Sequence, residues 1–142
     1  MISKRTKYAL NALVYLANQP RDEAIPISLI AASENISRKF LEAILLELRR
    51  SGMVNSKKGK EGGYCLSKSP EEINVAEVMR LFDGPIALLP CVTYKYYRRC
   101  DECKDEATCG IRKVFADLRE QTVNTLKAAT LAEILKLSHP VV

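Results

Sequence analysis

The stretch "ISRKFLEAILLELRRSGMVNSKKGKEGGYCLS" (residues 36–67) predicts a helix that is followed directly by a β-hairpin. Ser37 favours the position that caps a helix start, and Ser51-Gly52 favours a helix end. Between them, apolar side chains recur at steps of three and four residues, as on one face of a helix: Phe40, Leu41, Ile44, Leu45 and Leu48. Two short strands, 53–56 and 64–67, flank a loop rich in lysine and glycine.

Two further helices are predicted before this stretch. Residues 3–18 carry apolar side chains mostly on one face. A short helix over about 28–34 ends at Asn35, a residue type that tolerates the left-handed conformation. The predicted order is a first helix, a second helix of about seven residues, a four-residue turn and a third helix. This is the helix-turn-helix arrangement. Because a hairpin directly follows the third helix, the arrangement predicts a winged helix-turn-helix.

The rest of the chain is predicted to be helical except for one long loop. The pattern indicates a helix over 74–82 and a long helix over 111–128. Between them, residues 86–109 show no clean periodicity and are expected to form a loop. The sequence "TLAE" at 130–133 fits a capping box, which begins a last short helix that runs through Leu137.

Charge is distributed unevenly along the 142 residues. The net charge is +5; residues 1–60 hold 11 Lys and Arg against 5 Asp and Glu, whereas residues 61–142 hold 11 against 12. The excess positive charge therefore lies in the half that contains the predicted helix-turn-helix. This is expected if that half binds a polyanion such as double-stranded DNA. A basic surface without a partner is the alternative.

Candidate DNA-binding residues lie on three of the predicted elements. The first turn of a recognition helix reads base edges in the major groove, while Lys, Arg and helix N-termini hold phosphates. Arg38 or Lys39 could reach a guanine, and Glu42 could accept from a cytosine amino group. The candidate set is Ser37, Arg38, Lys39 and Glu42 on the third helix, Lys57, Lys58 and Lys60 on the wing, and Ser3, Lys4, Arg5 and Lys7 on the first helix.

The fold class that follows is mainly α with a small β-hairpin wing. Residues 1–85 are expected to form the winged helix-turn-helix DNA-binding domain, 86–110 a cysteine-rich sensor loop, and 111–142 a dimerisation helix with a short C-terminal helix. The long helix carries an apolar stripe that it cannot bury by itself. A second copy of the chain, giving a homodimer, is the expected partner. Packing against residues 3–18 of the same chain is the alternative.

No membrane or targeting signal is evident. No stretch approaches ~18 consecutive apolar residues, so no membrane span is expected. The N-terminal residues turn from basic to apolar, but they run into charged residues and lack a cleavage site, as a first helix does. A cytoplasmic location is expected, where thiols stay reduced and clustered cysteines more often bind metal than form disulfides.

A family resemblance is carried by residues 36–85, in which the hairpin is followed by "INVAEVM". The stretch resembles the Rrf-two family of bacterial winged helix-turn-helix regulators, of the IscR, NsrR and CymR type. The first helix, "SKRTKYAL", and the long helix after clustered cysteines fit as well, so the resemblance covers essentially the whole chain. It implies a homodimer that binds a two-fold operator, with the long helices crossing at the interface. It also implies that many members hold an iron–sulfur cluster between that helix and the DNA-binding domain.

The resemblance carries over to particular residues. It assigns recognition-helix positions to Ser37, Arg38, Lys39, Phe40 and Glu42. Lys58 matches a wing position that is often occupied by arginine. Where many members have Gly-Pro-Gly after that residue, this chain has Gly59-Lys60-Glu61, which makes its wing less rigid and more charged.

Four of the five cysteines lie within residues 91–109. Cluster-bearing members of the family have cysteines spaced as Cys-x5-Cys-x5-Cys. Cys103 and Cys109 fit the last two positions of this pattern, whereas the cysteine that would fill the first position is ambiguous. Arg112 stands where assembly-type members have a histidine ligand, and Lys7 where others have an acid. Both familiar fourth ligands are therefore missing while an extra cysteine is present. The inferred ligand set is Cys91, Cys100, Cys103 and Cys109.

Four thiolates suit more than one kind of metal site. They match a [2Fe–2S] or [4Fe–4S] cluster and equally a tetrahedral zinc. An iron–sulfur cluster is the preferred interpretation, and structural zinc or a reversible thiol–disulfide switch is the alternative. Four neighbouring cations are expected to lower the thiol pKa values and offset thiolate charge: Arg98, Arg99, Lys104 and Arg112. Cys65, on a wing strand, is expected to be a packing residue.

These observations together predict a homodimeric, sequence-specific transcriptional repressor that senses iron–sulfur or redox status through its cysteines. In this hypothesis, gain, loss or oxidation of a cluster repositions the two DNA-reading heads. A small metal or redox protein without DNA binding is the alternative from another class. No enzyme activity is expected, because the only histidine is His139 and no carboxylate or nucleophile arrangement surrounds the cysteines.

Overall fold

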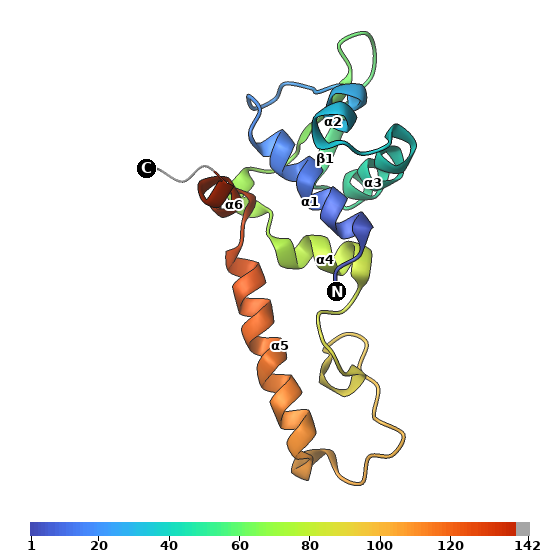
Figure 1. The fold of residues 1–142 in the computed structure, drawn as a ribbon, viewed down its shortest axis with the longest axis vertical. Coiled ribbons are helices and arrows are strands. Elements are labelled where there is room, and N and C mark those ends of the chain that lie inside the picture. The colour runs from blue at the N-terminus through green and yellow to red at the C-terminus, as the bar shows by residue number, and fades with distance from the viewer. Residues whose placement is uncertain (139–142) are drawn as a thin grey trace.

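A helical head with a β-hairpin and one long helix make up the protein in the computed structural model, which describes residues 1–138 (Figure 1). His139 lies outside the described residues. The elements are α1 (Lys4–Ala17), α2 (Ile27–Glu34), α3 (Arg38–Arg50), β1 (Val54–Lys57), β2 (Gly63–Leu66), α4 (Val75–Asp83), α5 (Gly110–Ala128) and α6 (Leu131–Ser138), with short 3₁₀ helices η1 (Pro70–Glu72), η2 (Pro90–Val92) and η3 (Glu106–Thr108). The predicted fold class, mainly α with a hairpin wing, is confirmed. Within this range, no helix is both long and apolar enough to cross a bilayer.

The buried face of α3 holds the helix-turn-helix together. Ser37 caps the helix as predicted, since its Oγ accepts a hydrogen bond from the backbone N–H of Phe40 at 3.3 Å. Four of its side chains expose none of their surface: Leu41, Ile44, Leu45 and Leu48. They pack in one core with residues of α1 and α2. Asn35 ends α2 in the left-handed conformation (φ 54°, ψ 47°), which turns the chain into α3.

The wing is an antiparallel hairpin in which Val54 lies opposite Leu66. It is tied to the head by a bridge that the sequence pattern did not reveal. Ile25 and Tyr64 exchange two backbone hydrogen bonds of 2.8 Å, so the link between α1 and α2 acts as a third, one-residue strand. Cys65 on β2 is only 8% exposed, which confirms its prediction as a packing residue.

The first turn of α1 is joined to the end of α4 by a carboxylate. Asp83 Oδ2 accepts hydrogen bonds from the Thr6 hydroxyl at 2.7 Å and from the Ser3 backbone N–H at 3.2 Å. Thr6 is completely buried. Burial raises the pKa of Asp83, but the hydrogen bonds from Ser3 and Thr6 outweigh it, and the net pKa is lowered. The charged carboxylate is therefore the form that joins the two helices.

The C-terminal third leaves the head and returns to it. α5 packs mainly on α4 and η2, while α6 packs on α1 and η1, so packing of the long helix against residues 3–18 is not the observed arrangement. Backbone N–H groups of Val75 and Leu131 donate to the carbonyls of Ala129 and Ile73 at 3.0 and 2.9 Å. The predicted cap of α6 is confirmed, because Thr130 Oγ1 accepts from the Glu133 N–H at 3.2 Å.

The loop between α4 and α5 is more ordered than its sequence pattern indicated. It contains η2 and η3, and α5 begins at Gly110, one residue before the predicted start. Figure 1 shows this segment alongside the far half of α5, at the opposite end of the molecule from the wing. Three apolar side chains on α5 remain exposed: Ile111 (66%), Val114 (65%) and Leu118 (41%).

Replacing Gly63 by alanine is expected to loosen the wing. A Cβ at this position would lie against the backbone carbonyl of Ile25, closer than non-bonded atoms approach. We expect G63A to lower the free energy of unfolding by about 2 kcal/mol or more, measured by urea denaturation. G110A is the matched control because its Cβ would meet open space at a helix start. Equal stability of G63A and wild type would contradict the bridged arrangement.

Replacing Asp83 by asparagine is expected to lower stability in a pH-dependent way. Because its pKa is lower in the folded state, the carboxylate stabilises the fold at pH values above its ordinary 3.8, and this contribution is lost as pH falls through the folded value. D83N should cost about 1 kcal/mol near neutral pH, a figure reduced for surface exposure. The difference from wild type should shrink as the pH falls below 3.8, as measured by urea denaturation at neutral and acidic pH. E61Q, at the wing tip, should show no such trend.

Candidate functional site

The first turn of α3 presents charged side chains to solvent. Arg38, Lys39 and Glu42 are all exposed. Arg38 Nε lies 3.4 Å from Glu42 Oε1, and the two side chains are 66% and 56% exposed. An exposed ion pair of this kind contributes little stability, so either partner can exchange it for a base or phosphate at small cost. The charged side chains of this turn are therefore available to bind a ligand, whereas the Ser37 hydroxyl is already used by the helix cap.

Phe40 has a different position from its charged neighbours. Its ring meets Tyr8 of α1 edge to face, with centroids 5.5 Å apart and planes at 88°. It is 36% exposed. The ring therefore packs α3 against α1 while part of it stays at the surface.

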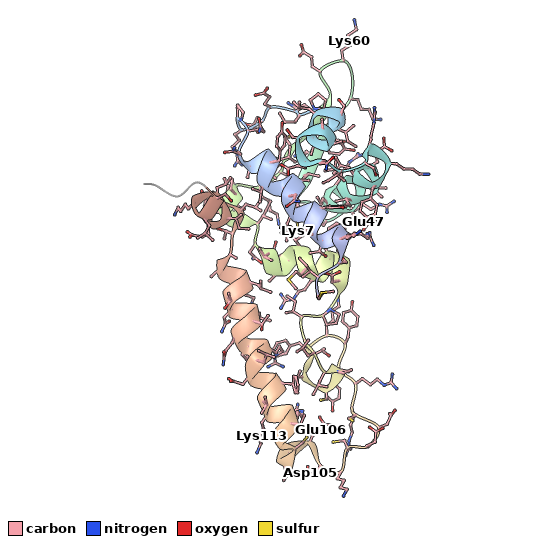
Figure 2. All side chains as sticks on the ribbon, in the orientation of Figure 1. Lys7, Glu47, Lys60, Asp105, Glu106 and Lys113 are labelled. Carbon is pink, nitrogen blue, oxygen red and sulfur yellow. The ribbon has the colours of Figure 1, made fainter. Side chains whose placement is uncertain are left out.

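The wing carries the second group of candidate residues. Lys57, Lys58 and Lys60 are exposed, and Figure 2 places Lys60 at the extreme tip of the loop. Lys57 Nζ donates to the backbone carbonyl of Asp22 at 3.2 Å, which attaches it to the link between α1 and α2. Lys58 and Lys60 are thus the wing cations that project from the head.

The start of α1 supplies the third group. Ser3 caps the helix, with its Oγ accepting from the Thr6 N–H at 3.2 Å, so its hydroxyl is already engaged. The Arg5 guanidinium lies 5.2 Å from the centre of the Phe82 ring and is directed toward α4. Lys4 and Lys7 are exposed. Figure 2 shows Lys7 on the head, away from the cysteine segment of its own chain.

The cysteine segment forms a cavity beside the start of α5. The cavity has a volume of about 610 Å³. Its lining includes the four predicted ligands and all four predicted cations: Cys91, Cys100, Cys103, Cys109, Arg98, Arg99, Lys104 and Arg112. Residues that are spread over 22 positions of the sequence therefore meet around one space. Cys91 comes from η2 and Cys109 from the cap of α5.

The cysteines differ in their surroundings. Cys91 is buried, with 8% of its surface exposed, and Cys100 is exposed. Cys109 caps α5, since its Sγ accepts from the Arg112 N–H at 3.4 Å. All the cysteines are free thiols, and no three His, Cys, Asp or Glu side chains among residues 1–138 lie close enough to hold a metal ion. The donor set fits a thiolate-ligated group in number and chemistry, but the loop must contract around it.

The expected lowering of thiol pKa values is wrong for Cys100. Its thiol donates to Glu102 Oε2 at 3.1 Å, and this hydrogen bond raises the pKa of Cys100. The cations that were expected to act on the thiols are used elsewhere. Arg98 pairs with Asp101 at 3.8 Å, while Arg99 lies near the carboxylate of Glu106. The acidic residues of the loop therefore take up much of the positive charge.

Glu106 is the residue around which the cysteine loop is organised, and the sequence analysis did not identify it. Its carboxylate accepts a hydrogen bond from the Tyr97 hydroxyl. It also lies 3.4 Å from Arg112 Nε and 3.8 Å from Arg99 Nε. The Arg112 contact is an ion pair without hydrogen-bond geometry, because Arg112 Nε has no acceptor. Arg99 donates in addition to the carbonyl of Cys103 at 3.2 Å, so Glu106 links both ends of the loop.

Comparison with known proteins places this arrangement in a family. The sequence model described as "Rrf2: Iron-dependent Transcriptional regulator" matches residues 2–137. The chain belongs to the Rrf2 family. Rrf2-family proteins are transcriptional regulators, not enzymes, and this chain is accordingly a DNA-binding transcriptional regulator.

Individual Rrf2-family relatives match over almost the entire chain. An rrf2-like HTH-type transcriptional regulator of Rhodobacter capsulatus is 43% identical over 143 residues, covering 99% of this chain and 95% of the relative. The HTH-type transcriptional regulator NsrR of Halalkalibacterium halodurans is 29% identical, covering 94% and 89%. The structure of CymR, the global cysteine regulator of B. subtilis, superposes with a TM-score of 0.80 at 26% identity, covering 96% of this chain and 97% of that one.

Substitutions on the two DNA-facing elements should separate base reading from phosphate binding. R38A should cost about 1–3 kcal/mol on the preferred site and relax its sequence preference. K58A should weaken binding to all duplexes and reduce the slope of log K against log salt by about one. Fluorescence anisotropy with a duplex selected from a random pool measures both. K113A, at the far end of α5 in Figure 2, is the control. If K113A weakened DNA binding as much as K58A, the wing would have no specific role in binding DNA.

Proposed function

We propose that this Rrf2-family regulator is a cytoplasmic homodimeric repressor that binds a two-fold operator and senses iron–sulfur or redox status through Cys91, Cys100, Cys103 and Cys109. The observation that carries the proposal is the cavity of about 610 Å³ that these four thiols line together. Clustered thiols with basic neighbours are a common setting for a metal or a redox reaction. No histidine is among the lining residues, and the four thiols lie there together with the carboxylates of Asp101, Glu102 and Asp105.

The same four residues would hold an iron–sulfur cluster. Such a cluster supplies reversible one-electron chemistry and can be lost or oxidised. The residues of the chain determine the surroundings of the site. Arg98, Arg99, Lys104 and Arg112 line the same cavity and would offset part of the charge of four thiolates, since Asp101 and Glu106 already pair with the three arginines. Cys91 is the buried member of the set. For ligation, Cys100 must give up the proton that it now donates to Glu102.

Dimerisation is supported by apolar side chains on α5 that remain exposed. Ile111, Val114 and Leu118 lie at steps of three and four residues and are 66%, 65% and 41% exposed. A helical stripe of this kind is stabilised when a second copy covers it. The partner's operator half-site would then be read by its own α3.

Coupling between the two sites is proposed to run through α5 and α4. Cys109 caps α5, and η2, which contains Cys91, packs on the same helix. α4 packs on both α5 and α1, and Asp83 fixes it to the first turn of α1. A change in the conformation of residues 86–109 would therefore alter the angle between α5 and the head that carries α3. This is a local change with a global readout.

Anaerobic purification followed by visible absorption and iron, sulfide and zinc analysis tests the proposal. The protein should be coloured, with iron and sulfide in comparable amounts. C103S and C109S should lose the colour and the iron, and should bind operator DNA with an affinity changed by about tenfold. C65A is the matched control, because Cys65 lies in the wing core.

Each alternative has its own result in this experiment. If the protein is colourless and holds zinc, the site binds a structural metal and not an iron–sulfur cluster. A protein that holds no metal but forms a disulfide on oxidation would favour a thiol–disulfide switch. Unchanged DNA affinity in C103S and C109S would refute the coupling, whichever group is bound.

A further inference from the structure

A second cavity, separate from the cysteines, lies where α4, the following loop and α5 meet. Its volume is about 300 Å³, at the lower end of the range for small-molecule sites. Three cations line it, one from each of these segments: Arg80, Lys95 and Arg119. No carboxylate is among its lining residues. The pocket therefore has the electrostatics of an anion site, in a part of the chain where the overall charge is slightly negative.

The floor of the pocket is built around Arg119. Its side chain is only 15% exposed, and its guanidinium lies 4.2 Å from the centre of the Tyr94 ring. Its two Nη atoms donate to the Val92 carbonyl and to Glu120 Oε1, and these hydrogen bonds fix the orientation of the guanidinium group. Its Nε is buried and has no hydrogen-bond acceptor. Because buried donors normally have a partner, this one is a donor that a bound anion could satisfy.

The rim supplies two further charges. Arg80 and Lys95 are exposed, and no ion pair is found for either among residues 1–138. Glu120 neutralises Arg119, so two positive charges remain to be matched. The other lining residues include Ile86, Val123 and the Tyr96 ring, which are apolar or aromatic, and Thr93. A ligand that complements these walls has a dianionic group and a short apolar body.

We propose that this pocket is an effector site for a small phosphate monoester. A phosphate dianion matches two unpaired cations, and arginine binds its oxygens in a fixed fork. The ligand would contact the end of α4, residues 84–96 and the middle of α5 at once. These are the segments that set the angle between the head and α5, so a bound ligand would fix that angle. The site requires no metal, and none of the four proposed cysteine ligands lines it.

Isothermal titration calorimetry at constant ionic strength tests the proposal with phenyl phosphate as the probe. We expect saturable binding, with inorganic phosphate about tenfold weaker because it leaves the apolar walls uncovered, and with phenol undetectable because it carries no charge. R80Q and K95Q should each weaken phenyl phosphate by about tenfold. K113Q, on another face of α5, and K58Q, on the wing, remove the same charge elsewhere and should bind like wild type.

Hydrogen exchange locates the bound probe. Amides of residues 84–96 should exchange more slowly with phenyl phosphate, and those of the wing should be unaffected. The proposal is overturned if K113Q or K58Q weakens binding as much as R80Q, since binding would then follow net charge. Absence of saturable binding, or protection confined to the wing or α3, would overturn it as well. All variants are titrated in preparations of the same metal content, so the comparison does not depend on the cysteine site.

Discussion

Burial of one face of α3 is the constraint on which the DNA-reading part of the structure depends. Leu41, Ile44, Leu45 and Leu48 expose no surface, so α3 can sit on the core in one orientation only. Fully burying side chains of this size contributes roughly 1.5–3 kcal/mol each, far more than any contact on the outer face. The charged side chains of the first turn must then point outward. The residues that we propose to read bases are thereby positioned by three leucines and an isoleucine in the core.

Local signals in the sequence were sufficient to predict the helices and the wing. Ser37, Asn35 and Thr130 occupy the cap positions that their chemistry indicated, because caps depend on neighbours only three or four residues away. The bridge between Ile25 and Tyr64 was not predictable in the same way. It joins segments 39 positions apart, and a single paired residue leaves no alternating pattern.

In the cysteine loop, the spacing of residues in the sequence predicted only part of the structure. Composition and a family resemblance selected four thiols, and the fold brings all four to the wall of one cavity. The direction in which the pKa of Cys100 shifts could not be inferred from nearby arginines, because Glu102 accepts a hydrogen bond from its thiol. Glu106 was missed because a single glutamate among many acidic residues carries no motif. Only the fold reveals that Tyr97, Arg99 and Arg112 converge on it.

The return of α6 to the head gives α5 the mechanics of a lever. Only two residues separate the helices, and backbone hydrogen bonds at Ala129 and Leu131 fix that end to the strand-like segment before α4. The 19 residues of α5 span about 28 Å, so a displacement of about 2 Å at the Cys109 end corresponds to a rotation of about 4° about this fulcrum. A small rearrangement at the Cys109 end is in this way converted into a change of the angle between α5 and the head.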